Sequence, residues 1–129
     1  MNKQFVLDTH TLLWMQDDSD LLSANAKDIL CDSRNELYVS IASFWEITIK
    51  QSLGKLHLSY TIDELIQSCA INSIFILPIQ ITYLKALSIL PLFHRDPFDR
   101  IIAATAIEMN YALITKDSNL HKYDLMVIW

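Results

Sequence analysis

Short apolar runs alternate with longer helix-like segments along the chain, and this alternation limits the possible folds most. The runs have the length of strands that are buried on both faces of a parallel sheet. Strands that alternate with helices indicate a parallel sheet covered by helices on both faces. We therefore predict an α/β fold with about five strands. The predicted strands are 4–8, 36–39, 73–77, 111–115 and 125–129, and the predicted helices are 9–15, 24–33, 41–53, 61 onwards, 81–90 and 97–109.

Capping residues mark several helix ends. Ser23 and Ser40 each stand just before a helical segment, where a hydroxyl accepts hydrogen bonds from free backbone N–H groups. Thr61 and Glu64 have the spacing of a capping box. Gly54 is the only glycine, and it follows a helix where a left-handed residue is favoured. These helix ends therefore agree with the predicted alternation of strands and helices.

The composition is that of one globular domain, which we place at residues 1–129. Hydrophobic residues make up 52% and charged residues 19%, which is not a disordered composition. The net charge is -5, so the chain lacks the general basic surface of many nucleic-acid-binding proteins. Cys31 and Cys69 lie far apart, and we interpret them as reduced core thiols of a cytosolic protein.

We expect neither a secretion signal nor a membrane span in this chain. One lysine and a short apolar run precede Asp8, which is not the pattern of a signal peptide. The most apolar region, 71–93, is interrupted by polar residues and by Pro78 and Pro91, whereas a spanning helix needs about 20 mostly apolar residues. We expect a cytoplasmic protein that does not contact the membrane.

The stretch from His94 to Arg100, with the sequence HRDPFDR, opens a very apolar helix. Asp96 is expected to be the N-cap, Pro97 the first helical residue and Asp99 the third. Because the helix is apolar on nearly all sides, we expect it to be buried in the centre of the domain.

Four acidic residues are expected at one edge of the sheet. Asp8 ends the first strand and Asp117 follows the fourth, so their carboxylates meet if those strands are neighbours. Glu46 and Asp99 lie near the starts of helices that begin at the same edge. Ligands of open parallel sheets bind beyond the carboxyl ends of the strands, where the strand order switches.

Such a cluster of carboxylates suits a divalent cation, because like charges raise one another's pKa. An all-oxygen site without cysteine favours Mg²⁺, with Mn²⁺ as a substitute, over zinc. One or two such ions activate water and stabilise charge during phosphodiester hydrolysis. The residues leave the number of ions open.

Each acid also has a structural interpretation. Asp8 can cap the next helix while it binds metal, and Thr9 either orients a carboxylate or is a helix-start hydroxyl. Glu46 fits a capping box with Ser43 or a surface ion pair with Lys50. We favour the metal role for Glu46, Asp99 and Asp117, although Asp117 can also cap its own turn, and the capping role for Asp96.

Basic and aromatic residues near the acids have less specific roles. Arg95, Arg100 and Lys116 either contact the phosphates of a nucleic-acid substrate or balance local charge. His94 and His10 are interpreted as structural, since metal-assisted hydrolysis needs no histidine acid or base. Three tryptophans are expected in the core or beneath a protein partner: Trp14, Trp45 and Trp129.

Four segments, in order and spanning nearly the whole chain, resemble the PIN-domain ribonucleases, in particular the VapC-type toxins of bacterial toxin–antitoxin pairs. They are VLDTHT at 6–11, SFWEITIK with LGKL between 43 and 56, HRDPFDR at 94–100 and LITKD at 113–117.

The resemblance implies a three-layer α/β/α sandwich and magnesium-dependent endoribonuclease activity. It also implies a cognate antitoxin, an RNA substrate and a homodimer. By position, the metal-binding and catalytic acids are Asp8, Glu46, Asp99 and Asp117, because Asp99, unlike Asp96, has the family spacing to the Ile102-Ala103-Ala104 run. Thr9, Asp96 and Thr115 are the supporting residues.

Three other functions fit parts of the sequence pattern. A haloacid-dehalogenase-type phosphatase begins with Asp-x-Asp-x-Thr after its first strand, but His10 stands two residues after Asp8, so the second aspartate is absent. A magnesium-binding receiver domain needs an acid at the end of the third strand, which instead ends at Leu77 and Pro78. A catalytically silent PIN-like binding module stays open, although the complete set of four acids argues against it.

Overall fold

The computed structural model describes residues 3–129. Its elements follow the predicted alternation and add one short 3₁₀ helix. They are β1 (Gln4–Leu7), α1 (Thr9–Gln16), α2 (Ala24–Cys31), β2 (Glu36–Ser40), α3 (Ile41–Ser52), α4 (Ile62–Ile71), β3 (Ile74–Leu77), α5 (Ile81–Ser88), α6 (Pro97–Met109), β4 (Ala112–Ile114), η1 (Leu120–Lys122) and β5 (Val127–Ile128).

The five strands form one parallel sheet in the order β3-β2-β1-β4-β5. β1 therefore lies between β2 and β4, and the strand order switches between β1 and β4. Receiver domains of the flavodoxin-like type have the order 2-1-3-4-5, so the receiver alternative is wrong. The neighbouring placement of β1 and β4, on which the meeting of Asp8 and Asp117 depended, is confirmed.

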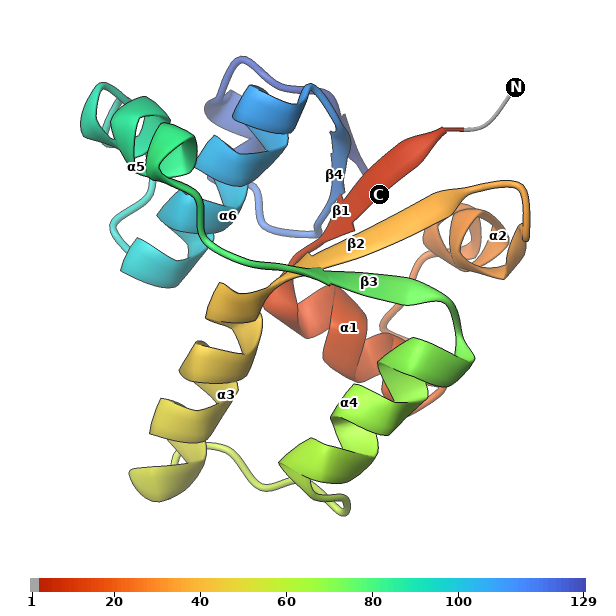
Figure 1. Cartoon of the computed structure of the whole chain (residues 1–129). Coiled ribbons are helices and arrows are strands. Elements are labelled where there is room, and N and C mark those ends of the chain that lie inside the picture. Colours follow the sequence, from red (N-terminus) through yellow and green to blue (C-terminus); the bar gives the residue numbers. More distant parts are fainter. Residues whose placement is uncertain (1–2) are drawn as a thin grey trace.

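Helices cover both faces of the sheet, which confirms the three-layer α/β/α sandwich. Figure 1 shows α1, α3 and α4 on one face and α5 and α6 on the other. The side chains of β1 alternate accordingly: Phe5 and Leu7 join the core under α1, α3 and α4, whereas Val6 packs against α6. No helix within residues 3–129 has the length and apolarity to cross a membrane.

The predicted caps form. Ser40 accepts the Ala42 N–H at the start of α3, and Thr61 and Glu64 make a capping box at α4. Gly54 has a φ of 68° just after α3, so it fills the left-handed position expected there. The helix α6 is buried along a continuous run from Ile101 to Ala106, as its composition predicted.

Several element boundaries and the predicted burial of one cysteine differ from the structure. α2 ends at Cys31, two residues early, because the Asp32 carboxylate accepts the Arg34 N–H and turns the chain. α5 ends at Ser88 and not at 90. Cys69 is buried, but Cys31 is exposed, so the prediction of two core thiols was wrong for Cys31. Cys31 lies five residues after buried Ala26, on another side of the helix.

Candidate active site

The carboxyl ends of β1 and β4 place Asp8 and Asp117 at the switch point of the sheet. Asp8 follows the last residue of β1, and Asp117 lies just beyond β4. Thr115 connects them: its hydroxyl donates to Asp8 Oδ2 and accepts the Asp117 N–H at 3.0 Å. The supporting residue Thr115 therefore fixes both acids, although it lies far from Asp8 in sequence.

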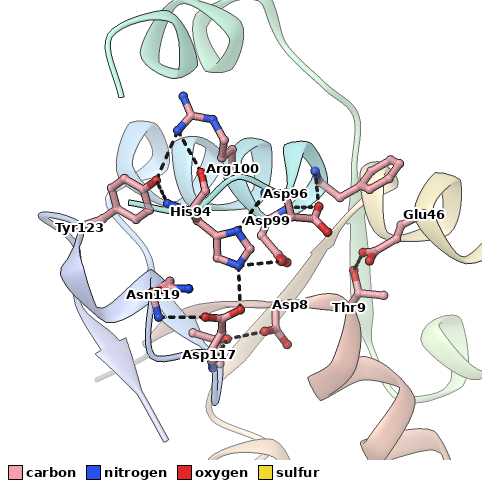
Figure 2. Close-up of polar contacts among 12 residues, drawn as sticks. Asp8, Thr9, Glu46, His94, Asp96, Asp99, Arg100, Asp117, Asn119 and Tyr123 are labelled. Atoms are coloured by element: carbon pink, nitrogen blue, oxygen red, sulfur yellow. Dashed lines mark hydrogen bonds and ion pairs between the residues drawn. The ribbon is translucent and has the colours of Figure 1, made fainter. Parts of the chain in front are cut away.

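Asp8 caps α1 and also faces the site. Its Oδ1 accepts the Thr11 N–H at 2.8 Å, so the capping interpretation holds. Its second oxygen points toward Thr115 and the acidic cluster (Figure 2). Burial raises the pKa of Asp8, and the hydrogen bonds from Thr115 and Thr11 only partly offset this. A buried carboxylate with a raised pKa is typical of functional sites.

Glu46 enters the site from α3 and is only 2% exposed. The Thr9 hydroxyl donates to Glu46 Oε1 at 2.6 Å, and the Lys50 ammonium pairs with Oε2. The predicted ion pair with Lys50 thus exists, but its carboxylate is buried and does not lie on the surface. No capping box forms with Ser43, because the N-cap of α3 is Ser40. Thr9 therefore orients a carboxylate.

Asp96 and Asp99 have different roles at the start of α6: Asp96 caps the helix and Asp99 faces the site. Asp96 is the N-cap, and its Oδ1 accepts the N–H groups of Phe98 at 2.8 Å and Asp99 at 3.3 Å. The Asp99 carboxylate turns toward the other acids (Figure 2). Burial, together with the negative charges of Asp96 and Glu46, raises the pKa of Asp99 to about 7. The pKa of Asp99 is therefore raised both by burial and by the neighbouring acids.

Asp117 completes the set of acids, and a histidine joins it. His94 Nε2 lies 2.8 Å from Asp117 Oδ2 and 3.2 Å from Asp99 Oδ2. Asp117 also caps its own turn, since its Oδ1 accepts the Asn119 N–H at 2.9 Å. Partial burial alone raises the pKa of Asp117, but the hydrogen bonds from His94 and Asn119 outweigh burial and lower it.

The donor atoms at this edge fit a hard divalent cation. One ligand-type atom each of His94, Asp99 and Asp117 lies within 4.8 Å of the others. Asp8 and Glu46 stand outside this tightest group, but both charges reach Asp99 and raise its pKa. Carboxylate and hydroxyl oxygens dominate the set, as Mg²⁺ and Mn²⁺ prefer. A cation among them would relieve the repulsion that the raised pKa of Asp99 reflects.

The three basic residues near the acids differ in whether their side chains are exposed or hydrogen-bonded to the protein. Arg95 and Lys116 are exposed. Arg100 instead donates to the carbonyl oxygens of Pro91 at 3.0 Å and Leu90 at 3.3 Å, so it holds the loop before α6.

The tryptophans also differ. Trp14 and Trp129 pack against the core and against each other, but Trp45 is 58% exposed. Of the two positions expected for Trp45, the core is therefore excluded, and a position beneath a protein partner stays a prediction.

Two residues make contacts in the site that the sequence did not predict. His94 contacts two of the acids, and its nearness to Asp96 and Asp99 in sequence was the available signal. Tyr123 accepts the His94 N–H at 3.0 Å, and no local pattern marked it.

The fold and the site together define a three-layer α/β protein with a carboxylate cluster at the switch point of a parallel sheet. The chain belongs to the PIN domain family, since the family model of the PIN domain matches residues 5–125.

Individual relatives agree with this assignment. Ribonuclease VapC22 of Mycobacterium tuberculosis is 28% identical over 120 residues, which cover 92% of this chain and 90% of the relative. VapBC2 of Rickettsia felis, solved with a DNA fragment from its promoter, matches with a TM-score of 0.68, 14% identity and 97% of each chain covered. A toxin–antitoxin complex from Klebsiella pneumoniae matches with a TM-score of 0.64 and 17% identity over 96% of this chain and 95% of that chain. These two structures show the shared fold.

Proposed function

We propose that this protein is a metal-dependent endoribonuclease and the toxin of a toxin–antitoxin pair. The observation that carries the proposal is the convergence of Asp8, Glu46, Asp99 and Asp117 at the switch point, with the pKa of Asp99 raised to about 7. Membership of the PIN family and the similarity to a protein named ribonuclease VapC22 support RNA as the substrate.

The four carboxylates would hold Mg²⁺, or Mn²⁺ in its place. When bound, such an ion supplies Lewis-acid activation of a water nucleophile and neutralises charge at the scissile phosphate. The chain itself contributes orientation: Thr9 and Lys50 fix Glu46, and Thr115 fixes Asp8. These contacts among the chain's own residues would keep the carboxylates oriented toward the ion.

RNA contact falls to the basic residues that are exposed at the surface. Exposed Arg95 and Lys116 can reach phosphates near the acids, whereas the guanidinium of Arg100 is engaged by the loop. The charge of -5 gives no general attraction for RNA. Binding should therefore depend on a few local contacts and on the cation.

We also propose a cognate antitoxin, a homodimer and a cytoplasmic location. The matched solved structures include toxin–antitoxin complexes, which supports an antitoxin partner. Co-purification of this chain with the product of a neighbouring small gene, followed by measurement of the complex mass, tests both partners.

The test of the activity uses purified protein that mass analysis shows to be free of antitoxin. Structured RNA is incubated with Mg²⁺, with Mg²⁺ and excess EDTA, and with the Asp99→Asn variant. We expect internal cleavage only by wild-type protein with free Mg²⁺. Absence of cleavage by folded, antitoxin-free protein that binds the metal would favour the silent binding module.

A further inference from the structure

The ring of His94 lies between a backbone N–H on one side and two carboxylates on the other. Nδ1 accepts the Asp96 N–H at 3.0 Å. Nε2 is 2.8 Å from Asp117 Oδ2 and 3.2 Å from Asp99 Oδ2 (Figure 2). The side chain of His94 is only 12% exposed, so these groups define its surroundings.

These partners fix the tautomer of the ring. A nitrogen that accepts a hydrogen bond carries no hydrogen, so the hydrogen of the neutral imidazole is on Nε2. Nε2–H then donates to Asp117 and, over the longer distance, to Asp99. Metal ligation through Nε2 would require the hydrogen to move to Nδ1, where it would face the Asp96 N–H. The His94 ring is therefore a hydrogen-bond donor to the acids and not a metal ligand.

The loop that carries His94 is held independently of the acids. The His94 N–H donates to Tyr123 Oη at 3.0 Å, and Arg100 Nη1 donates to the carbonyl oxygen of Pro91 at 3.0 Å. Arg100 Nη1 also lies 3.4 Å from both the His94 carbonyl oxygen and Tyr123 Oη. The backbone of His94 is thus held by contacts other than those of its ring with the acids.

We propose that His94 is a positioning residue of the metal centre, whose Nε2–H holds the carboxylates of Asp117 and Asp99 together while leaving both available as ligands. This inference rests on the proposed function, because it presumes that these acids bind a divalent cation. Without the donor, the two like charges are free to separate, and the ion must bring them together again. Loss of hydrogen bonds to metal ligands typically costs 10- to 100-fold in affinity.

The test measures Mn²⁺ binding to metal-free protein by the electron paramagnetic resonance signal of free Mn²⁺, which requires no RNA cleavage. His94→Leu removes the donor and keeps a similar volume, whereas His94→Gln keeps an N–H near the position of Nε2. His57→Leu, at an exposed histidine in the segment between α3 and α4, is the matched control. Thermal melting confirms that each variant is folded.

We expect His94→Leu to weaken Mn²⁺ binding about 10-fold or more, His94→Gln to stay within about threefold of wild type, and His57→Leu to equal wild type. Pulsed resonance spectra of the bound ion should show no coupling to a directly coordinated nitrogen. A coordinated nitrogen that disappears in His94→Gln would overturn the inference, because His94 would then be a ligand.

Two further outcomes separate the inference from the proposed function. Wild-type affinity in folded His94→Leu, with binding still lost in Asp99→Asn, overturns the role of His94 alone. No Mn²⁺ binding by the wild-type protein overturns the metal centre and the role of His94 together. If His94→Leu does not fold, wild-type affinity in His94→Gln and the nitrogen spectra still decide between donor and ligand.

Discussion

Replacement of Asp99 by asparagine should stabilise the metal-free protein at alkaline pH. The folded protein holds a proton on Asp99 up to a pKa of about 7, whereas the ordinary pKa of an aspartate side chain is 3.8. Between these values the folded state binds more protons than the unfolded chain, so its stability falls as pH rises through this window. Above about pH 7 the folded protein bears the full free-energy cost of keeping Asp99 ionised. Asparagine resembles the neutral acid in size and carries no charge to bury.

The magnitude follows from the shift in pKa. A rise from 3.8 to about 7, at about 1.4 kcal/mol per unit, corresponds to about 4 kcal/mol. The neighbouring carboxylates titrate together with Asp99 and share this cost. Asp99→Asn should therefore raise the free energy of unfolding at pH 8 by about 1 to 4 kcal/mol relative to wild type. At pH 4 the two proteins should differ by less than about 1 kcal/mol.

The assay is urea denaturation in EDTA between pH 4 and pH 8. Glu108→Gln, on the exposed surface of the same helix, is the matched control and should keep the wild-type pH dependence. Added Mg²⁺ should stabilise wild type above pH 7 and leave Asp99→Asn nearly unchanged. The reasoning is refuted if Asp99→Asn follows the wild-type curve at every pH, or is less stable than wild type at pH 8.

Three further substitutions test other parts of the site. Asp8→Asn should reduce RNA cleavage by at least about 100-fold without unfolding the protein, because loss of a metal ligand costs more than loss of a residue that only hydrogen-bonds to a ligand. Full activity of the variant would show that Asp8 is not part of the site. Asp96→Asn should keep cleavage, because asparagine caps as well as aspartate, whereas Asp96→Ala should lower the free energy of unfolding by about 1 kcal/mol in urea. Lys116→Ala should raise KM with kcat unchanged and reduce the slope of log affinity against log salt by about 0.7; an unchanged slope would exclude a phosphate contact.

The order and type of the elements followed from local sequence. Strand length, the caps Ser40 and Asp96, and Gly54 after α3 each act within a few residues, so a single stretch of chain contains the whole signal. The start of α6 shows this best. Asp96 and Pro97 were separable from Asp99 because N-cap geometry leaves the third helical residue free to face elsewhere.

The contacts that complete the site come from distant parts of the chain. Thr115 reaches Asp8 across 107 positions, and His94 reaches Asp117 across 23. No periodicity specifies such pairs, because they follow from the order of the strands and from the path of a loop. The exposure of Trp45 has the same origin: its neighbours Phe44 and Glu46 are buried, and composition alone does not say which side of α3 faces solvent.

The central claim is that the acids at the switch point hold the divalent cation. The most direct measurement is a crystal structure of the protein in Mn²⁺, with an anomalous difference map recorded at the manganese absorption edge. The account predicts a peak within about 2.5 Å of carboxylate oxygens from Asp99 and at least one other of Asp8, Glu46 and Asp117. A fully ordered site without a peak, or Mn²⁺ bound only elsewhere on the molecule, would contradict it.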